Sequence, residues 1–522
     1  MEIEQAVYGI QSCSICVWVL IIFFSCYSYY IIGVKKQRIR SKLKRQGISG
    51  PLPSLVFGNV PEINRIMSMS KQKSKDVKEP LLLEDCSLSL FPYLKRWTEQ
   101  FGETFIFALG GVQIMYVTNV KLVRELSIFK SLDLGKPDYL QTERGPLLGK
   151  GLIASSGSLW AHQRKTIAPH LYMYKIKDMT DLIVESANAL VKSWESRIET
   201  NGGVGVVDLA VDDDVRSFTA IVISKILFGR NYDEGAQIFP KLRALLKEMA
   251  SPTILNGIPF SRYFPTNQNR RVWRLEKEIH CMIMAIKEKH SGRVCGDMME
   301  AIKEGAENAK LGQSAEDQYV ADNCKNLFLA GAEIPAVSAI WGVMLLASHP
   351  HWQTRLRNEL QQVFGGTKNI IDPSMLGKCK LLEMVVQEVL RLYPAIIFVS
   401  RQALKDIKIG ETCIPKGVNI WIWLLELHRD PQLWGSDALQ FNPERFANGV
   451  SGACKCPQAY LPFGVGSRVC PGQSLALVEL KILFASIVSN FNLSVSPKYV
   501  HSPAYGLLLH PKQGVHLLVQ KI

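Results

Sequence analysis

Hydrophobic residues recur at helical spacing along several long stretches of the chain. This spacing predicts helices over Thr180–Thr200, Gln318–Ser348, Trp352–Val363, Leu381–Tyr393 and Ser474–Asn490. Shorter stretches that alternate apolar and polar residues, bounded by glycine and proline, predict strands over Thr104–Ala108, Ile114–Thr118, Ile407–Ile409 and Val418–Ile422. We therefore expect a mainly α fold with small β-sheets, of the α+β class. The chain contains no dinucleotide-binding or P-loop glycine motif.

The first 34 residues follow a different pattern. Between Gln5 and Val34 there is no Asp, Glu, Lys or Arg, and Ile15–Val34 has the length of a helix that crosses a bilayer. Because acidic residues precede this stretch and no small-residue cleavage site follows it, an uncleaved anchor is favoured over a signal peptide. We expect residues 1–34 to be a single-pass membrane anchor, with the basic residues after it in the cytosol.

The segment after the anchor predicts a stiff connection to one large domain. We expect residues 35–60 to be a basic juxtamembrane segment followed by a Pro/Gly hinge, since Gly50-Pro51-Leu52-Pro53 restricts the backbone. The stretch Met67–Pro80, rich in Ser and Lys, is expected to be an exposed loop. No repeat or second linker follows, so residues 61–522 are expected to form one domain.

Composition narrows the classes of function. The 47% apolar and 21% charged residues exclude an intrinsically disordered chain. The 61 basic and 47 acidic residues give a net charge of +14, but seven basic residues lie within residues 35–45, so the charge does not indicate nucleic-acid binding. Twelve cysteines without regular spacing predict reduced thiols and a domain in the cytosol.

The segment Phe463–Gly472 (FGVGSRVCPG) combines the features of a ligand site. Its three glycines let the backbone approach a bulky, flat ligand. Cys470 precedes a predicted helix, where amide groups and the helix N-terminus can stabilise a thiolate. Arg468 supplies a positive charge for an anionic group of the same ligand. A lone cysteine is usually a small buried hydrophobe, but here cysteine, arginine and glycines occur together.

This segment matches the haem-binding signature of cytochromes P450, F-x-x-G-x-R-x-C-x-G, at every fixed position. Glu388–Arg391 resembles the E-x-x-R pair of that family, Pro443–Phe446 resembles its later arginine motif, and Trp160–Arg164 resembles its W-x-x-x-R helix. The resemblance implies a cytochrome P450 fold with haem b as cofactor. The residues implied to bind the haem are Trp160, Arg164, Arg401, Phe463, Gly466, Arg468, Cys470 and Gly472, with Cys470 as the iron ligand. Glu388, Arg391 and Arg445 are implied to form a supporting network.

The resemblance also implies an activity and partners. A cysteinate ligand favours activation of O2 at the iron, so the expected activity is that of a monooxygenase. Electrons would come from an NADPH–cytochrome P450 reductase, with cytochrome b5 as a possible second donor, since the chain has no flavin or nicotinamide motif. The implied location is the endoplasmic reticulum membrane, with the catalytic domain on the cytosolic side.

The substrate class is suggested by a narrower resemblance. Lys44–Pro51, Leu152–Leu171 and Gly257–Lys277 resemble membrane-bound plant enzymes of the clan that contains secologanin synthases and brassinosteroid hydroxylases, and most closely its gibberellin-modifying branch. That branch implies a terpenoid substrate, either a diterpenoid acid or a triterpenoid. The segments implied to face it are Pro137–Lys150, Ser251–Tyr263, Ala395–Val399 and Tyr505–Leu508. Within or near them, the apolar candidates are Ile334, Ile396, Phe398 and Leu507.

The central helix departs from the family pattern. The family carries [AG]-G-x-[DE]-T-[TS], whereas this chain has Ala330-Gly331-Ala332-Glu333-Ile334-Pro335. Ile334 has no hydroxyl group to hold a water molecule, and Pro335 removes one amide donor. We expect Glu333, and Ser338 one turn later, to take part in proton delivery instead. Glu333 as a solvated surface carboxylate is the alternative.

Three hypotheses of function follow. The first is a monooxygenase that works without the usual threonine. The second is a haem-thiolate enzyme whose product is rearranged, dehydrated or desaturated, because protonation of bound oxygen matters less in such reactions. The third is a haem-containing membrane protein that carries a ligand without catalysis. Turnover with NADPH and reductase distinguishes the third from the other two.

Overall fold

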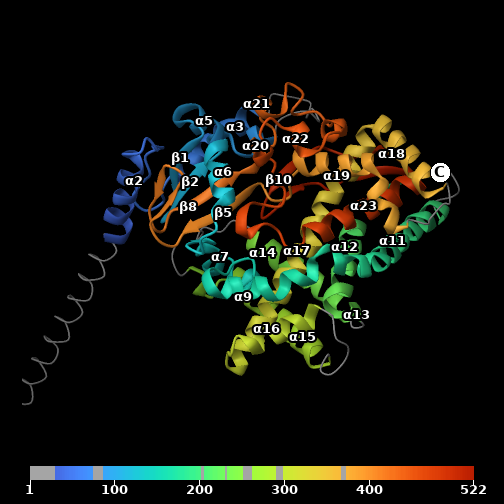
Figure 1. Cartoon of the computed structure of the whole chain (residues 1–522), viewed down its shortest axis with the longest axis horizontal. Coiled ribbons are helices and arrows are strands. Elements are labelled where there is room, and N and C mark those ends of the chain that lie inside the picture. The colour runs from blue at the N-terminus through green and yellow to red at the C-terminus, as the bar shows by residue number, and fades with distance from the viewer. Residues whose placement is uncertain are drawn as a thin grey trace, which may run out of the picture.

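The structure is a computed structural model, which describes residues 30–74, 86–200, 205–229, 232–250, 261–289, 298–365 and 372–522. A helical region and a smaller β-rich region lie beside each other (Figure 1). The longer helices are α2 (Lys36–Lys44), α3 (Val60–Ser74), α5 (Pro92–Phe101), α6 (Val120–Ile128), α9 (Gly157–Ile167), α11 (Thr180–Thr200), α12 (Asp212–Phe228), α14 (Ile238–Ala250), α15 (Asn267–Lys289), α16 (Met298–Asn308), α17 (Gln313–Ser348), α18 (Pro350–Phe364), α19 (Lys380–Leu392) and α23 (Gln473–Asn490).

The strands are short and form separate sheets. They are β1 (Thr104–Leu109), β2 (Val112–Val117), β3 (Leu134–Gly135), β4 (Val206–Ala210), β5 (Phe398–Ala403), β6 (Ile407–Ile409), β7 (Thr412–Ile414), β8 (Asn419–Trp423), β9 (Phe491–Val495), β10 (Pro503–Tyr505), β11 (Leu509–Pro511) and β12 (His516–Lys521). The largest sheet has the order β1-β2-β8-β5-β3, in which β2 and β8 are parallel. In the antiparallel pair of β5 and β8, Phe398 is opposite Trp423 and Arg401 is opposite Ile420.

The predicted fold class is confirmed, as are the elements taken from the hydrophobic pattern. Helix α11 and strand β6 have the predicted bounds, and α17 begins five residues earlier than expected, at Gln313. The prediction of a loop over Met67–Pro80 is wrong for the part that the structure describes, because residues 67–74 continue helix α3. The buried side chain of Ile66 anchors that helix, although its outer face is polar.

Helix α17 forms the centre of the helical region. It packs against α12, α16, α19 and α23, and it continues through Pro335 without a break. Helices α17 and α23 are both long and apolar enough to cross a membrane. Their most apolar windows, however, are 83% and 61% buried inside the protein, so the structure identifies both as core helices.

The basic segment after the predicted anchor packs against the β-rich region as helix α2. Ile39 and Leu43 are buried, and the guanidinium of Arg40 donates a 2.6 Å hydrogen bond to the carbonyl of Pro51. Lys42 pairs with Asp406 at 3.0 Å. Part of the cationic cluster therefore fixes this segment to the domain. Most of the predicted anchor lies outside the residues that the structure describes.

Candidate functional site

The loop that carries Cys470 is closed by its own backbone. The amide of Cys470 donates to the carbonyl of Phe463 at 2.9 Å, and Gly464 and Gly466 have φ values of 77° and 72°. A Cβ atom on Gly466 would lie 3.2 Å from the carbonyl oxygen of Ser127. Glycine is therefore required at position 466 both for its φ angle and for close contact with the end of α6.

Cys470 is half-buried. Burial raises its pKa, while the hydrogen bond with Gly472 and the positive charge of Arg164 lower it. The local hydrogen bond therefore favours the thiolate, in the direction that the sequence predicts, while burial opposes it. Desolvation is the larger effect, so the anionic form depends on a bound cation such as a metal ion.

Three arginines predicted to contact the cofactor meet around this loop. Arg401, on β5, is buried and donates to the carbonyl of Val465 at 3.0 Å. Arg468 donates to the carbonyl of Ser155 at 2.9 Å, and its guanidinium lies 4.1 Å from the centre of the Trp160 ring. From α9, Arg164 donates to the carbonyl of Val469 at 2.6 Å. The predicted haem contacts therefore converge on one place.

A fourth cation, Lys136, belongs to the same cluster. Burial, followed by the charges of Arg401 and Arg468, lowers its pKa well below the ordinary lysine value. Burial also lowers the pKa of Arg401 to about 10 and, together with repulsion from Arg401 and Arg164, that of Arg468 to about 9. Sequence reasoning missed Lys136, because a lysine after a two-residue strand carries no motif.

This cluster fits a ligand with anionic groups. Within the described residues, none of these four cations forms an ion pair with a carboxylate. Buried cations without counter-charges are unfavourable unless a ligand supplies the negative charge. Haem carries two carboxylates and an iron that takes a thiolate ligand. Cys470 and the cations around it therefore suit haem.

The predicted supporting network is also present, with one additional member. Glu388 and Arg391 are fully buried and form two hydrogen bonds of 2.6 and 2.8 Å. Arg445 lies 3.7 Å from Glu388 but pairs more closely with Asp437, at 2.6 Å. Asp437 was not predicted, because nothing near it in the sequence marks it as an arginine partner.

Helix α17 has one accessible patch in an otherwise buried stretch. From Tyr319 to Ala347 every residue is buried except Ala330, Gly331 and Ile334. These three residues lie within about one turn and are partly accessible, although Gly331 packs so closely against Ile223 on α12 that a Cβ atom would not fit. The residue in place of the usual threonine, Ile334, is therefore at the accessible patch, as its position in the motif implies.

Glu333 points into a network of ion pairs. Its carboxylate lies 3.4 Å from Arg216 Nε on α12 and 3.2 Å from Arg243 Nε on α14, the second pair without hydrogen-bond alignment. Glu333 is 5% exposed, which contradicts the alternative of a solvated surface carboxylate. Arg216 and Arg243 were not predicted. Ser338 is buried one turn after Ile334.

Aromatic side chains from three elements pack against one another. Phe398 stacks on Trp421 and on Trp423, with ring centres 4.3 and 5.6 Å apart. Tyr505 on β10 lies 6.3 Å from Phe398. We call Phe398, Trp421, Trp423 and Tyr505 the aromatic wall. Near it, Ile396 is 43% exposed and Leu507 is half-buried. Most of Ser251–Tyr263 lies outside the described residues.

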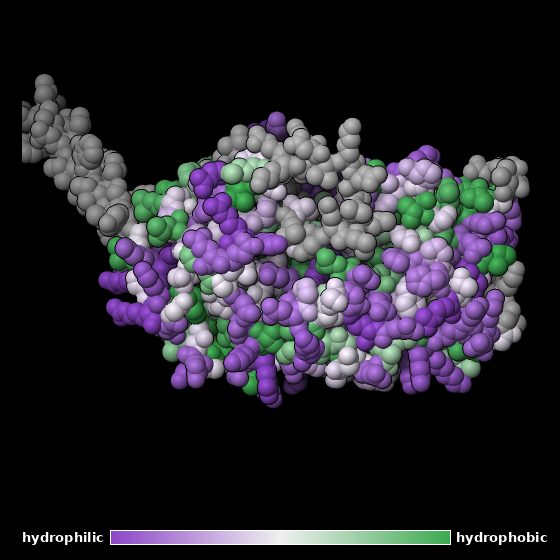
Figure 2. Space-filling model, turned by 90° about the horizontal axis from the view of Figure 1, so that it is seen from above, coloured by the Kyte–Doolittle hydropathy of each residue, from purple (hydrophilic) through white to green (hydrophobic). Residues whose placement is uncertain are grey.

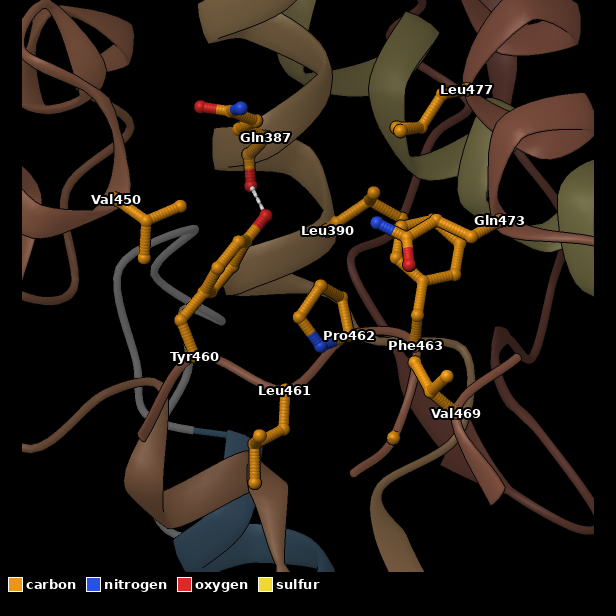
Figure 3. A pocket seen from close by; sticks show the side chains of 11 residues that line it. Gln387, Leu390, Val450, Tyr460, Leu461, Pro462, Phe463, Val469, Gln473 and Leu477 are labelled. Carbon is orange, nitrogen blue, oxygen red and sulfur yellow. Dashed lines mark hydrogen bonds between the residues drawn. The ribbon is translucent and has the colours of Figure 1, made fainter. Parts of the chain in front are cut away.

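A cavity of about 240 Å³ lies between α19, α23 and the Cys470 loop. Figure 3 shows Leu390, Phe463, Val469 and Leu477 around it, with the hydroxyl of Tyr460 bonded to the carbonyl of Gln387. The lining combines apolar side chains with the polar groups of Gln387, Tyr460 and Gln473. Its contact with Phe463 and Val469 places this cavity directly beside the cysteine loop.

Comparisons with known proteins agree with this geometry. The family model described as Cytochrome P450 matches residues 81–518. Over 510 residues the chain is 43% identical to Cytochrome P450 714C2 of Oryza sativa subsp. japonica, covering 97% of both proteins. It is 40% identical to Cytochrome P450 714B3 of Zea mays, covering 95% and 93%, and 38% identical to Cytochrome P450 714A2 of Arabidopsis thaliana, covering 96% and 98%.

Proposed function

The chain belongs to the cytochrome P450 family, and from that premise we propose that it oxidises a large terpenoid, either a diterpenoid acid or a triterpenoid. As a family member it is a haem-thiolate monooxygenase that relies on a reductase for electrons. The observation that carries the substrate class is the aromatic wall, in which the half-buried Phe398, Trp421 and Tyr505 give a large apolar skeleton a rigid surface.

Several residues of this chain bind different parts of the cofactor. In the proposal, Cys470 binds the iron, while Lys136, Arg401 and Arg468 neutralise the two carboxylates, and Trp160 is fixed beneath Arg468. Bound haem supplies the activation of O2. The surrounding apolar residues exclude water and orient one carbon of the substrate toward the iron.

Proton delivery is the part of the proposal in which this chain differs from its family pattern. We assign Glu333 and Ser338 to it. The ion pairs with Arg216 and Arg243 hold the Glu333 carboxylate in place and away from bulk water. Ile334 supplies no hydroxyl group, so a water molecule held near Ser338 would complete the path.

We propose that residues 1–34 anchor the protein in the endoplasmic reticulum membrane, that residues 35–60 connect the anchor, and that residues 61–522 form the cytosolic catalytic domain. Exposed apolar side chains support this arrangement: Leu52 is 90% exposed, and Leu55, Val56 and Phe57 are each more than half exposed. Figure 2 shows a group of hydrophobic residues, in green, at the left end of the domain. The partners would be an NADPH–cytochrome P450 reductase and cytochrome b5 in the same membrane.

A second candidate function is favoured by Ile334 and Pro335. Without the hydroxyl group, a reaction that ends in rearrangement, dehydration or desaturation would need less help with protonation. Such a product would have unchanged or lower mass, whereas the monooxygenase product gains one oxygen atom. The two candidate functions therefore differ in the mass of the product.

The test uses microsomes that contain the full chain and a plant reductase. Diterpenoid acids, triterpenoids and iridoids are each offered with and without NADPH, and the products are analysed by mass spectrometry. An NADPH-dependent gain of one oxygen on a diterpenoid acid or a triterpenoid is expected. Oxidation of iridoids alone would overturn the substrate class. As the control, Cys470→Ala should abolish both the product and the thiolate-type spectrum of the reduced, carbon-monoxide-bound protein.

A further inference from the structure

The cavity between α19, α23 and the Cys470 loop has no role in the proposed function. We call it the α19–α23 cavity. Leu390 on α19 and Leu477 on α23 line its helical side, and Phe463 and Val469 line the side of the loop. Its lining contains neither Cys470 nor the cations around that residue, which are Lys136, Arg164, Arg401 and Arg468. The cavity is therefore separate from the charged cluster that suits the haem carboxylates.

The volume of the cavity limits the size of a ligand. It measures about 240 Å³. A protein cavity of about 150 Å³ holds benzene, whereas sites for drug-sized ligands begin at about 300 Å³. The α19–α23 cavity therefore has room for one ring with small substituents. A polycyclic terpenoid is too large for it, so it is not a second site for the proposed substrate.

The lining favours a neutral ligand, because it carries no charged side chain. Glu383 lies one turn before Gln387 on α19, and Lys481 lies one turn after Leu477 on α23. These two charged residues form an ion pair with each other. A carboxylate or an amine in the cavity would be desolvated without a counter-charge, which is strongly unfavourable.

Two polar groups in the lining can bind a hydroxyl group. The hydroxyl of Tyr460 donates to the carbonyl of Gln387 at 2.8 Å, so its oxygen atom still accepts a hydrogen bond. The side-chain amide of Gln473, in the first turn of α23, forms no hydrogen bond within the described residues. In Figure 3 the rings of Tyr460 and Phe463 lie on either side of Pro462. The lining therefore combines a surface for a ring with partners for one polar group.

From these observations we propose that the α19–α23 cavity binds a neutral phenol with a single ring and small alkyl substituents. The ring packs against Leu390, Leu477 and Phe463, and the hydroxyl group forms hydrogen bonds with Tyr460 and Gln473. The inference goes beyond the proposed function and does not depend on the terpenoid class.

The cavity is placed to affect the iron ligand. The carbonyl of Phe463 accepts a 2.9 Å hydrogen bond from the amide of Cys470, and the carbonyl of Val469 accepts a 2.6 Å hydrogen bond from Arg164. A ligand in the cavity contacts both carbonyl-bearing residues and displaces water from this side of the loop. Because dry surroundings disfavour added negative charge, the bound phenol should lower the reduction potential of the haem.

The test counts bound phenol while the substrate site is blocked. The full chain with haem is placed in lipid nanodiscs and saturated with clotrimazole, whose imidazole binds the haem iron and whose three further rings are too large for the α19–α23 cavity. Binding of radiolabelled thymol is measured by equilibrium dialysis, with empty nanodiscs as the blank. Two further probes are p-cymene, which is thymol without the hydroxyl group, and 4-isopropylbenzoate, which carries a negative charge.

Wild-type protein should bind one thymol per chain. The affinity for p-cymene should be roughly fivefold to tenfold lower, the effect of one lost hydrogen bond, and 4-isopropylbenzoate should not bind. Gln473→Leu should weaken the binding of thymol but not that of p-cymene. Leu477→Trp fills the cavity and should abolish the binding of both. Leu439→Trp is the matched control, because it adds the same side chain at an exposed position outside the lining and should bind thymol as wild type does.

The outcomes test each part of the proposal. If wild type retains no thymol, or if Leu477→Trp binds as much as wild type, the site is overturned. Equal affinities for thymol and p-cymene would overturn the role of the polar groups. Thymol should lower the reduction potential in wild type and in Leu439→Trp but not in Leu477→Trp, and binding without this shift would overturn the effect on the cysteine loop.

Folding is checked by the reduced, carbon-monoxide-bound spectrum of each variant. If Leu477→Trp loses this spectrum, Val450→Phe takes its place, because Val450 lines the same cavity and is only half-buried. It should likewise abolish the binding of thymol, and retained binding would overturn the site.

Discussion

The Glu388–Arg391 network and the cluster of Lys136, Arg401 and Arg468 both hold buried charge, but only the first contains its own counter-charges. Glu388 is bonded to Arg391, and Asp437 to Arg445, entirely within the protein. The cationic cluster has hydrogen bonds to carbonyls and no carboxylate among the described residues. The first arrangement stabilises a fold, whereas the second is suited to an anionic ligand.

The largest effect is expected when the internal network is broken. Glu388→Ala leaves Arg391 charged and buried without its partner, which should lower the free energy of unfolding by about 3–5 kcal/mol. Urea denaturation of the purified protein measures this change. Glu444→Gln is the control, because Glu444 pairs with Arg355 on the surface and such pairs contribute at most about 1 kcal/mol. Equal effects of the two substitutions would contradict the comparison.

Removing a charge from the cationic cluster should affect the chain without haem and the haem-bound protein in opposite directions. Arg401→Gln removes a desolvated, repelled charge, so the chain without haem should be as stable as wild type or more stable. Haem affinity should fall by about tenfold to a hundredfold, the effect of a lost charged hydrogen bond. Transfer of haem to an excess of acceptor protein measures the affinity. A chain without haem that is strongly destabilised would show that Arg401 belongs to the fold instead.

Acid should lower the free energy of unfolding through the protonation of His428. Its Nε2 accepts a hydrogen bond from the amide of Leu461, and burial lowers its pKa to about 3. Between about pH 6.5 and 3 the unfolded chain binds a proton that the native histidine does not bind. The contribution of His428 is therefore complete above pH 6.5 and decreases as the pH falls, by about 2 kcal/mol at pH 5.

The measurement compares unfolding at pH 7.5 and pH 5. In His428→Asn this part of the pH dependence should disappear. His501→Asn is a useful second variant, because burial also lowers the pKa of His501, to about 4. An unchanged slope in the His428 variant would show that other groups dominate the acid sensitivity.

The smallest effect on stability is expected at Glu333. In Glu333→Gln each arginine keeps another carboxylate, Asp212 for Arg216 and Asp213 for Arg243, so stability should change by only about 1 kcal/mol. Product formed per NADPH consumed should fall, because the carboxylate is lost from the proposed proton path. If this ratio is unchanged, Glu333 has no part in proton delivery, and Ser338→Ala becomes the decisive variant.

Residues whose role depends on near neighbours were predictable. Cys470 and Gly466 lie within one short signature, and the structure shows the positive φ angle and the tight contact that require glycine. Arg391 lies one turn from Glu388, so their pairing follows from helix geometry. Lys136, Asp437 and Arg243 were not predicted, because their partners are separated from them along the chain and no local pattern links them.

The sequence by itself determined the family, the helical character, the choice of Cys470 as the proposed iron ligand and the departure at Ile334 and Pro335, since these depend on residue type and short-range spacing. The tertiary structure decided which charges are neutralised. It placed Glu333 beside Arg216 and Arg243, and it grouped Lys136 with Arg401 and Arg468 without a carboxylate partner among the described residues. The physical reason is that electrostatic interaction depends on distance and burial in space, and folding alone brings together charges that lie far apart in the chain.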